Sequence, residues 1–191
     1  MRAEDEQVAV FDAAGRMTGA APRGVVYRDG IWHGATGVLV RSGDGERVYL
    51  HRRSPEKLVF PHCYDCWAGG VIGPGETPDD AAARELEEEL GISDVPLTPT
   101  DRFTFDDGRL RYHVFGYEVA WDGPVRHQPE EVVWGGWVTL DALRALLDDP
   151  VRWPFAADGR AGIRRWFAAH DRAAHDRAAP DRAAYDRRDR A

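Results

Sequence analysis

The sequence predicts an α/β protein in which many short strands surround one well-capped helix. Runs of β-branched and aromatic residues alternate with turns rich in Gly and Asp through most of the chain. Residues 78–90 instead have the composition and the boundary residues of a helix, and two shorter helical patterns come late, at 140–147 and 159–170. Strands interleaved with few helices are typical of the α/β class.

The strands alternate with identifiable turns. In chain order, we expect them at residues 8–11, 16–18, 35–41, 47–51, 60–70, 102–105, 110–120 and 132–138. The first two predict an N-terminal hairpin of about residues 8–21, and residues 22–33 are expected to be irregular or weakly helical. The segments around Pro96 and Pro99 and around 123–129 are expected to be loops.

The helix at 78–90 has clear start and stop signals. Thr77 is a good N-cap, because its hydroxyl can accept a hydrogen bond from the first turn, and Pro78 suits the first helical position. Asp79 and Asp80 fall in the first turn, where the helix dipole favours negative charge. Gly91 follows as a residue that readily adopts the left-handed conformation ending a helix.

Three carboxylates, those of Glu85, Glu88 and Glu89, fall within about 100° of one another on one face of this helix. Like charges at these spacings repel by a few tenths of a kcal/mol per pair, roughly, even when solvated. A bound Mg²⁺ or Mn²⁺ would turn that repulsion into attraction, because these hard cations prefer carboxylate oxygens. Taken alone, the face fits either a solvated acidic surface or a metal site.

The spacing around the helix favours the metal site. Counting from Gly70, the sequence is Gly, five residues, Glu76, seven residues, Arg84-Glu85-Leu86, one residue, Glu88-Glu89, one residue, Gly91-Ile92. This spacing resembles the Nudix box, GX5EX7REUXEEXGU with U apolar, at all nine specified positions. On these 23 residues the chain is identified as a member of the Nudix superfamily.

The resemblance implies both a fold and a reaction. Nudix proteins form an α/β/α sandwich with a mixed β-sheet, and their box is a loop–helix–loop that binds divalent metal. They cleave a diphosphate linkage by attack of water on phosphorus. The implied cofactor is therefore Mg²⁺ or Mn²⁺, and the implied partner is a small-molecule diphosphate, such as a nucleoside diphosphate derivative or a related organic pyrophosphate.

The resemblance also implies roles for the box residues. By position, Glu88 and Glu89 would be the principal metal ligands, and Glu85 would be a further ligand or the catalytic base. The supporting positions would be Gly70, whose carbonyl would reach a metal, Glu76, which would support metal or water, and Arg84, which would orient the carboxylates. Which carboxylate acts as the base stays open.

Two segments outside the box add candidate residues. Arg52, Arg53 and Lys57 form a basic cluster just before the box in an otherwise acidic chain, which predicts contact with substrate phosphates. A solvated basic loop is the alternative. Glu130 and Glu131 precede a Trp-containing strand, as in many members of the family, where such a loop supplies a metal contact or the base. We favour Glu131, against an exposed loop carboxylate.

One stretch before the box narrows the resemblance. HRRSPEKLVFP is similar to the Nudix branch related to isopentenyl-diphosphate isomerases, which use a Cys, a Glu and a His-rich metal site. The isomerases have a degraded box, whereas this box is intact and Cys66 is out of register by a few positions. Hydrolysis is therefore preferred over allylic isomerisation. A non-catalytic ligand-binding module is the third alternative.

The cysteines and the aromatic residues give weaker signals. Cys63 and Cys66 form a C-x-x-C without the second pair that a structural zinc site needs, so buried, inert thiols are favoured. The sequence does not identify the substrate. Trp32, Trp67, Trp134 and Tyr112 are candidates for stacking on a base, although most of the seven Trp residues are expected in the core.

Composition bounds the partners and the compartment. The formal net charge is −8, which argues against binding of a nucleic acid duplex, although metal ions can still attract a phosphorylated substrate. The sequence has no long apolar run and no signal-peptide pattern, which predicts no membrane association. With only two cysteines, a cytoplasmic protein is expected.

The domain organisation is expected to be simple. Residues 1–169 are predicted to form one domain, followed by a tail at 170–191 that repeats every five residues and has almost no large apolar side chains. We expect this tail to be solvated and partly disordered. The N-terminal hairpin completes the sheet of its own domain or pairs across a homodimer, and the sequence leaves both alternatives open.

Overall fold

The computed structural model describes residues 3–178, and these contain one mixed β-sheet with helices on both faces. Its strands are β1 Gln7–Phe11, β2 Met17–Pro22, β3 His33–Arg41, β4 Arg47–Arg53, β5 Tyr64–Asp65, β6 Trp67–Ala68, β7 Thr98–Asp106, β8 Arg111–Ala120 and β9 Val132–Thr139. The helices are α1 Arg23–Asp29, α2 Pro78–Leu90, α3 Leu140–Leu147 and α4 Ala157–Ala178, after a 3-10 turn at Ala3–Asp5. The predicted α/β class is confirmed.

Strand β3 organises the sheet. It pairs in parallel with β8 along its whole length, from His33 opposite Tyr112 to Arg41 opposite Ala120. It also pairs antiparallel with β1, β4 and β6, while β7 extends the sheet beyond β8 and β9 extends it beyond β4. Parallel and antiparallel pairs therefore coexist, and the sheet is mixed as expected.

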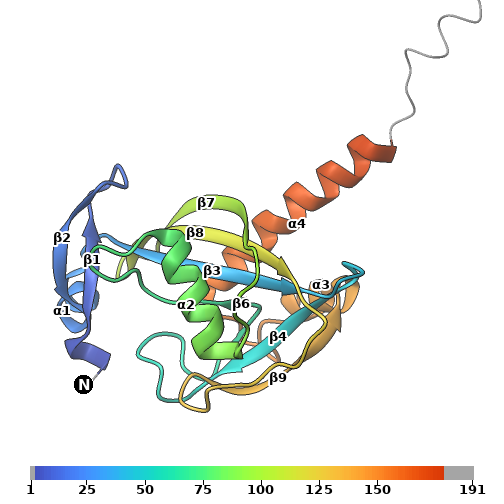
Figure 1. Cartoon of the computed structure of the whole chain (residues 1–191), viewed down its shortest axis with the longest axis horizontal. Helices are drawn as coiled ribbons and strands as arrows, with labels where there is room; N and C mark the ends of the chain where they lie inside the picture. The colour runs from blue at the N-terminus through green and yellow to red at the C-terminus, as the bar shows by residue number, and fades with distance from the viewer. Residues whose placement is uncertain (1–2, 179–191) are drawn as a thin grey trace, which may run out of the picture.

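Alternating side chains of β3 point into two separate cores. Val38 and Val40 pack with the buried face of α2, and Leu39 between them packs with α3 and α4. Successive side chains of a strand point to opposite faces, so three adjacent apolar residues indicate a strand covered on both sides. Figure 1 shows α2 in front of the strands and α4 behind them. This is the expected α/β/α sandwich.

Helix α2 begins and ends where its sequence predicts. The side chain of Thr77 accepts a hydrogen bond from the backbone N–H of Asp80 at 3.2 Å, and Gly91 adopts the left-handed conformation with φ 66°. Leu86 and Leu90 are fully buried against the sheet. Burying each such side chain contributes roughly 1.5–3 kcal/mol, which fixes the orientation of the helix.

Two segments differ from the expected strands. Residues 60–70 form two short strands instead of one, because Asp65 accepts hydrogen bonds from the backbone N–H groups of Cys66 and Trp67 and bends the chain there. Pro99 lies inside β7 and not in a loop. It is tolerated because β7 pairs on one side with β8 and has a bulge between Pro99 and Arg102.

The last helix continues beyond the expected end of the domain at residue 169. Helix α4 extends to Ala178, so the first residues of the predicted tail are helical. Their composition explains this, since Ala and Arg are strong helix formers and the five-residue repeat contains neither Gly nor a Pro before residue 180. The remainder of the predicted tail, residues 179–191, lies outside the described residues.

The N-terminal hairpin joins the sheet of its own chain. Strands β1 and β2 pair antiparallel, and β1 also pairs with β3 where Val10 lies opposite His33. The segment after the hairpin, where irregular or weakly helical structure was expected, forms the short helix α1. None of the helices within residues 3–178 combines the length and the apolar character needed to cross a membrane.

Candidate active site

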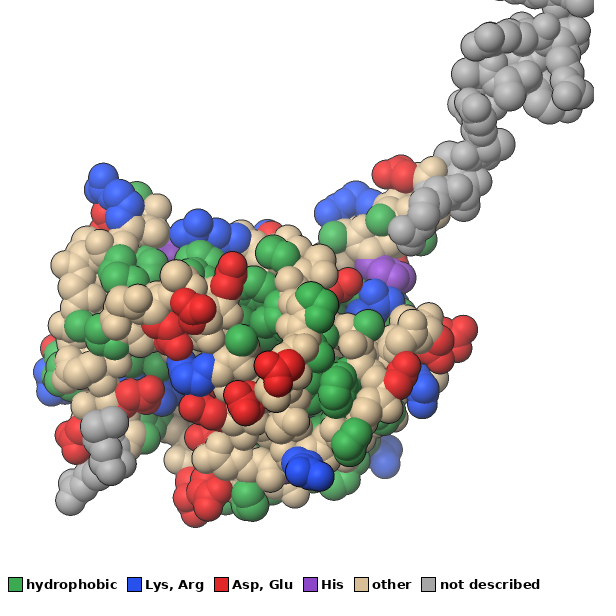
Figure 2. Space-filling model, in the orientation of Figure 1, with side chains coloured by type: hydrophobic (Ala, Val, Ile, Leu, Met, Phe, Trp, Pro, Cys, Tyr) green, Lys and Arg blue, Asp and Glu red, His purple; other side chains and the backbone are tan. Residues whose placement is uncertain are grey.

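The box helix presents its three carboxylates to different environments. Glu85 and Glu89 precede Leu86 and Leu90, and the packing of those leucines draws both carboxylates inward until they are only 8% and 1% exposed. The side chain of Glu88 is 52% exposed at the rim. Figure 2 shows acidic side chains gathered on the face of the molecule that carries α2.

Arg84 holds the acidic residues of the box together. Its guanidinium donates to both carboxylate oxygens of Glu76, at 2.8 and 3.1 Å, to Glu85 at 2.7 Å and to Glu88 at 3.1 Å. It also donates to the backbone carbonyl of Val71 at 3.2 Å. The predicted box residues are therefore brought together, with one cation shared among three carboxylates.

Two glycines where the box begins allow the backbone to pass close to its neighbours. A Cβ at Gly70 would lie only 2.5–2.6 Å from the carboxyl atoms of Glu85, so no larger residue fits there without moving Glu85. A Cβ at Gly69 would overlap the backbone carbonyl oxygen of Thr36. The Gly69 N–H donates to Glu89 at 3.2 Å, and the Gly70 carbonyl accepts from Thr36 at 2.8 Å and keeps a second lone pair.

A lysine connects the box to the acidic loop before β9. The Lys57 ammonium donates to Glu89 at 2.9 Å and also to Glu131, so it bridges two carboxylates that are far apart in sequence. Its side chain is only 10% exposed. The sequence predicts Glu131 as a candidate, and in the fold only the side chain of Lys57 separates it from Glu89 on the box helix.

The donor set fits a hard divalent cation. Within the described residues, no three His, Cys, Asp or Glu side chains are grouped around a common position for a metal. The box carboxylates Glu85 and Glu89 pair with Arg84 and Lys57, respectively. Glu85 and Glu89 nevertheless offer carboxylate oxygens from a buried face, beside the Gly70 carbonyl. Mg²⁺ and Mn²⁺ prefer oxygen ligands of this kind.

Burial raises the pKa of Glu85 to about 7, with a further contribution from the nearby charge of Glu89 and an opposing one from Arg84. Between its ordinary value of 4.5 and about 7, the folded protein therefore binds more protons than the unfolded chain. We expect the metal-free protein to lose stability as pH rises through this window, by up to about 3 kcal/mol from Glu85.

Thermal unfolding in chelator between pH 5 and 8 measures this effect. Glu85→Gln should flatten the pH dependence, and Mg²⁺ should oppose the loss because it favours the ionised carboxylate. Asp65 contributes in the same window, since burial and the charge of Asp158 raise its pKa to about 7. An Asp65→Asn variant should therefore remove a separate part of the slope. If Glu85→Gln left the pH dependence of stability unchanged, Glu85 would not be the group that titrates in this window.

A pocket opens beside Gly69 and Gly70 and extends along β3, β7 and β8 toward the start of α4. Its cavity volume is about 80 Å³. Arg53 and Lys57 line it, but Arg52 does not. As neighbours on a strand, Arg52 and Arg53 point in opposite directions, and Arg52 lies exposed over the ring of Tyr64 instead.

Arg53 has an unusual environment for a buried cation. Its side chain donates to the Val59 carbonyl at 3.2 Å, yet no carboxylate of the described residues lies within 4.0 Å and its Nε has no hydrogen-bond partner there. The residue is only 8% exposed. Burial disfavours the charged guanidinium, but the carboxylates of Asp65, Glu89, Asp158 and Glu131 stabilise it from beyond ion-pair distance and raise the pKa of Arg53 above its usual value.

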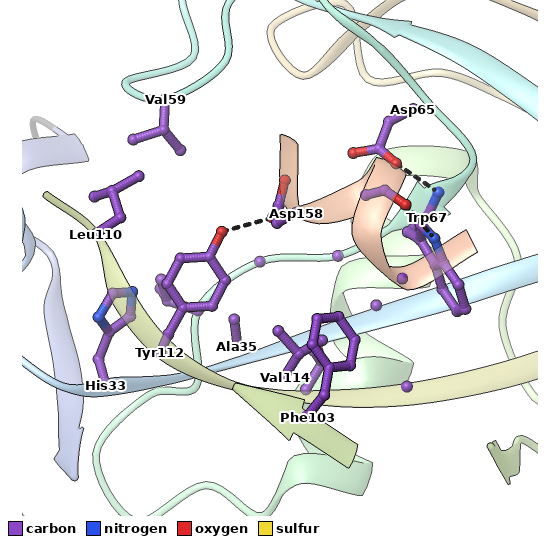
Figure 3. Close-up of a pocket in the computed structure, with 18 of the residues that line it drawn as sticks. His33, Ala35, Val59, Asp65, Trp67, Phe103, Leu110, Tyr112, Val114 and Asp158 are labelled. Atoms are coloured by element: carbon purple, nitrogen blue, oxygen red, sulfur yellow. Dashed lines mark hydrogen bonds between the residues drawn. The ribbon is translucent and has the colours of Figure 1, made fainter. Parts of the chain in front are cut away.

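The structure adds pocket residues that the sequence did not single out. Asp65 and Asp158 both line the pocket, and Figure 3 shows Asp158 directed toward the phenol of Tyr112. No motif in the sequence marks either residue: Asp65 lies next to Cys66, and Asp158 immediately precedes the helix expected at 159–170. Among the aromatic candidates, Tyr112 and Trp67 line the pocket.

The other two aromatic candidates lie elsewhere. Trp134 is 47% exposed on β9, and Trp32 packs against His113 with ring centroids 5.0 Å apart. Cys66 is buried among the apolar residues that join the sheet to α3 and α4, where burial raises the pKa of its thiol well above the usual value. Since Cys66 does not line the pocket, no observation favours the isomerase alternative.

Known proteins match most of the chain. Residues 32–159 match the NUDIX domain. An uncharacterized Nudix hydrolase of Rhodococcus erythropolis is 51% identical over 166 residues, covering 82% of this chain and 89% of the relative. Another from Streptomyces coelicolor is 41% identical over 174 residues, covering 88% and 94%.

Solved structures show the same fold. A crystal structure of a Deinococcus radiodurans protein superposes with a TM-score of 0.71 at 24% identity, covering 84% of this chain and 98% of that one. The NUDIX domain of a Shewanella oneidensis protein, solved in complex with ADP ribose, superposes with a TM-score of 0.56 at 17% identity, covering 72% and 86%.

Proposed function

The chain belongs to the Nudix hydrolase family, and on that premise we propose that it cleaves the diphosphate linkage of a small organic diphosphate with the help of Mg²⁺ or Mn²⁺. A nucleoside diphosphate derivative is the preferred substrate class. The observation that carries the proposal is the position of Glu85 and Glu89. Both are buried carboxylates in contact with Gly69 and Gly70, and these two glycines line a pocket together with the buried Arg53.

The box residues would hold the cation and order one another. We assign Glu85 and Glu89 as carboxylate ligands, with Glu88 reaching in from the rim and the Gly70 carbonyl as a further oxygen donor. Arg84 keeps Glu76, Glu85 and Glu88 in place through its fork of N–H donors. When bound, the metal neutralises charge on the diphosphate and lowers the pKa of the attacking water.

The chain's own carboxylates would take the proton from that water. A bond forms between the water oxygen and one phosphorus, the bridging P–O bond breaks, and the displaced phosphate leaves with the bridging oxygen. Glu131 and Glu85 are both candidates for the base, since each lies beside the buried box face and can accept a proton. In the described conformation Lys57 neutralises Glu131, so Lys57 must move if Glu131 is the base.

Arg53 is proposed to bind the diphosphate, and this can be tested against its neighbour. Arg53→Lys keeps the charge but loses the bidentate fork, so KM should rise by roughly tenfold or more with a smaller change in kcat. The matched control is Arg52→Lys on the exposed face of the same strand, which should leave both constants near those of the unmodified protein. Equal effects of the two substitutions would exclude a specific role for Arg53.

The overall proposal is tested by phosphate release from a panel of nucleoside diphosphate derivatives. Each compound is incubated with Mg²⁺, with Mn²⁺ and with chelator, and the nucleotide products are identified by chromatography. Isopentenyl diphosphate isomerisation is followed in parallel. Hydrolysis that requires metal is the expected result, whereas isomerisation without hydrolysis would overturn the proposal and return attention to Cys66.

A further inference from the structure

We propose that the pocket selects diphosphates whose organic part is a planar ring carrying an amino group, and that Asp158 recognises this amino group. The inference deepens the proposed function and rests on it for the position of the diphosphate near Arg53. Ring selectivity is a property of binding, however, and can be measured without hydrolysis.

Two carboxylates face the far part of the pocket. Asp65 is only 4% exposed, and one of its oxygens accepts hydrogen bonds from the backbone N–H groups of Cys66 and Trp67 at 2.8 and 3.1 Å. Asp158 enters from the first turn of α4, and both residues line the cavity. An amino group carries two N–H donors and can serve two acceptors, whereas a hydroxyl carries one.

Asp158 is held in place with one oxygen left over. The phenol of Tyr112 donates to its Oδ2 at 2.7 Å, and burial together with Asp158 raises the pKa of Tyr112 well above its usual value, so the phenol stays a donor. The other oxygen, Oδ1, is buried and has no hydrogen-bond partner among the described residues. A buried acceptor of this kind costs free energy unless a ligand donates to it.

Other polar atoms in the pocket are also left without partners. The hydroxyl of Thr36 is buried, lines the same cavity and has no hydrogen-bond partner within the described part of the chain. The Thr36 hydroxyl and the Oδ1 of Asp158 thus give the pocket two polar groups without partners, in addition to the Nε of Arg53, which is proposed to bind the phosphates. A purely hydrocarbon chain would leave all of them unsatisfied.

The remaining walls suit a flat ring. Figure 3 shows Tyr112, Val114 and Phe103 rising from the strands on one side, with Trp67 on the other. Aromatic and aliphatic side chains of this kind bury the faces of a ring, while the few polar groups read its edge. A sugar would expose several hydroxyls to these apolar walls, so the ring and not a sugar is assigned to this part of the pocket.

Matched nucleotides test the inference directly. ADP and IDP differ in the amino or keto group of the purine, and CDP and UDP differ likewise in the pyrimidine. Binding of each to the full chain is measured by calorimetry in chelator, which prevents metal-dependent turnover. We expect ADP and CDP to bind at least tenfold more tightly than their keto partners, because a wrong edge leaves a buried acceptor unpaired.

Two variants separate recognition from folding. Asp158→Asn replaces one acceptor by an amide donor, so the preference for the amino compounds should be lost or reversed. The control, Asp141→Asn on the exposed side of α3, should keep that preference. Tyr112→Phe removes the hydroxyl that orients Asp158, and should weaken binding of the amino compounds several-fold without reversing the preference. Circular dichroism and thermal unfolding establish that each variant is folded.

The outcomes distinguish this inference from the proposed function. Equal binding of ADP and IDP, an unchanged preference in Asp158→Asn, or tighter binding of dimethylallyl diphosphate than of ADP would each overturn the inference. If such results accompany metal-dependent hydrolysis of some diphosphate, the function stands and the inference fails. An Asp158-dependent preference in a protein that hydrolyses no diphosphate supports the inference and removes the proposed function.

Discussion

Replacing Glu89 by Gln is expected to lower turnover by about 100- to 1,000-fold while leaving the protein folded. Glutamine has the same shape but lacks the negative charge that a divalent cation needs, and Glu89 is buried on the face of α2 that meets Gly69. Lys57 loses one of its two partners in this variant and retains Glu131. Glu88→Gln should act in the same direction. Steady-state kinetics with Mg²⁺ and a thermal unfolding curve measure both effects.

The control lies on the same helix. Glu87 occupies a variable position of the box between Leu86 and Glu88, is exposed, and makes no salt bridge with any described residue. Glu87→Gln therefore removes one negative charge from the same helix, two residues before Glu89, without changing the buried face. Its turnover should stay within about twofold of the unmodified protein, as for most surface substitutions. A Glu89→Gln variant as active as Glu87→Gln would remove Glu89 from the metal site.

Alanine at Gly69 and alanine at Gly70 are expected to fail in different ways. At Gly69 the new Cβ overlaps the backbone carbonyl of Thr36, and backbone cannot easily move, so the free energy of unfolding should fall by about 3 kcal/mol. For a chain of this size, that loss lowers Tm by roughly 6–12 °C. At Gly70 the Cβ meets the carboxyl end of Glu85 at 2.5–2.6 Å, and a side-chain end can be pushed aside.

Gly70→Ala should therefore spare stability and damage the site. We expect Tm to change by only a few degrees and turnover to fall by about 100-fold, because Glu85 is moved away from Glu89 and from Arg84. The neighbouring variants control for each other, since both replace Gly by Ala one residue apart. Comparable losses of Tm in both would show that Glu85 is rigidly fixed. Full activity in Gly70→Ala would argue against Glu85 as a ligand.

The box helix was predictable because its signals are local. Thr77, Pro78 and Gly91 define its ends through interactions within a few residues, and the 3.6-residue period fixes which carboxylates share a face. Periodicity did not show how deeply each carboxylate is buried. That depends on the packing of α2 against the sheet, which separates the buried Glu85 and Glu89 from the exposed Glu88.

The pocket was harder to predict because its residues come from distant parts of the chain. The basic cluster predicted three phosphate contacts, but strand alternation directs Arg52 away from the pocket and Arg53 into it. Asp158 meets Tyr112 across 46 residues of sequence through the packing of α4 on β8. No local pattern encodes that contact, because it depends on where the first turn of α4 lies against the sheet.

The most direct test of the central claim is a titration of Mn²⁺ into the full chain, followed by electron paramagnetic resonance of the free ion. The unmodified protein and Glu87→Gln are expected to bind Mn²⁺ with the same affinity. Glu89→Gln and Glu85→Gln should each bind it at least tenfold more weakly, because each removes a charged oxygen ligand. Equal Mn²⁺ affinity in all four proteins would contradict a metal site built from the buried carboxylates of α2.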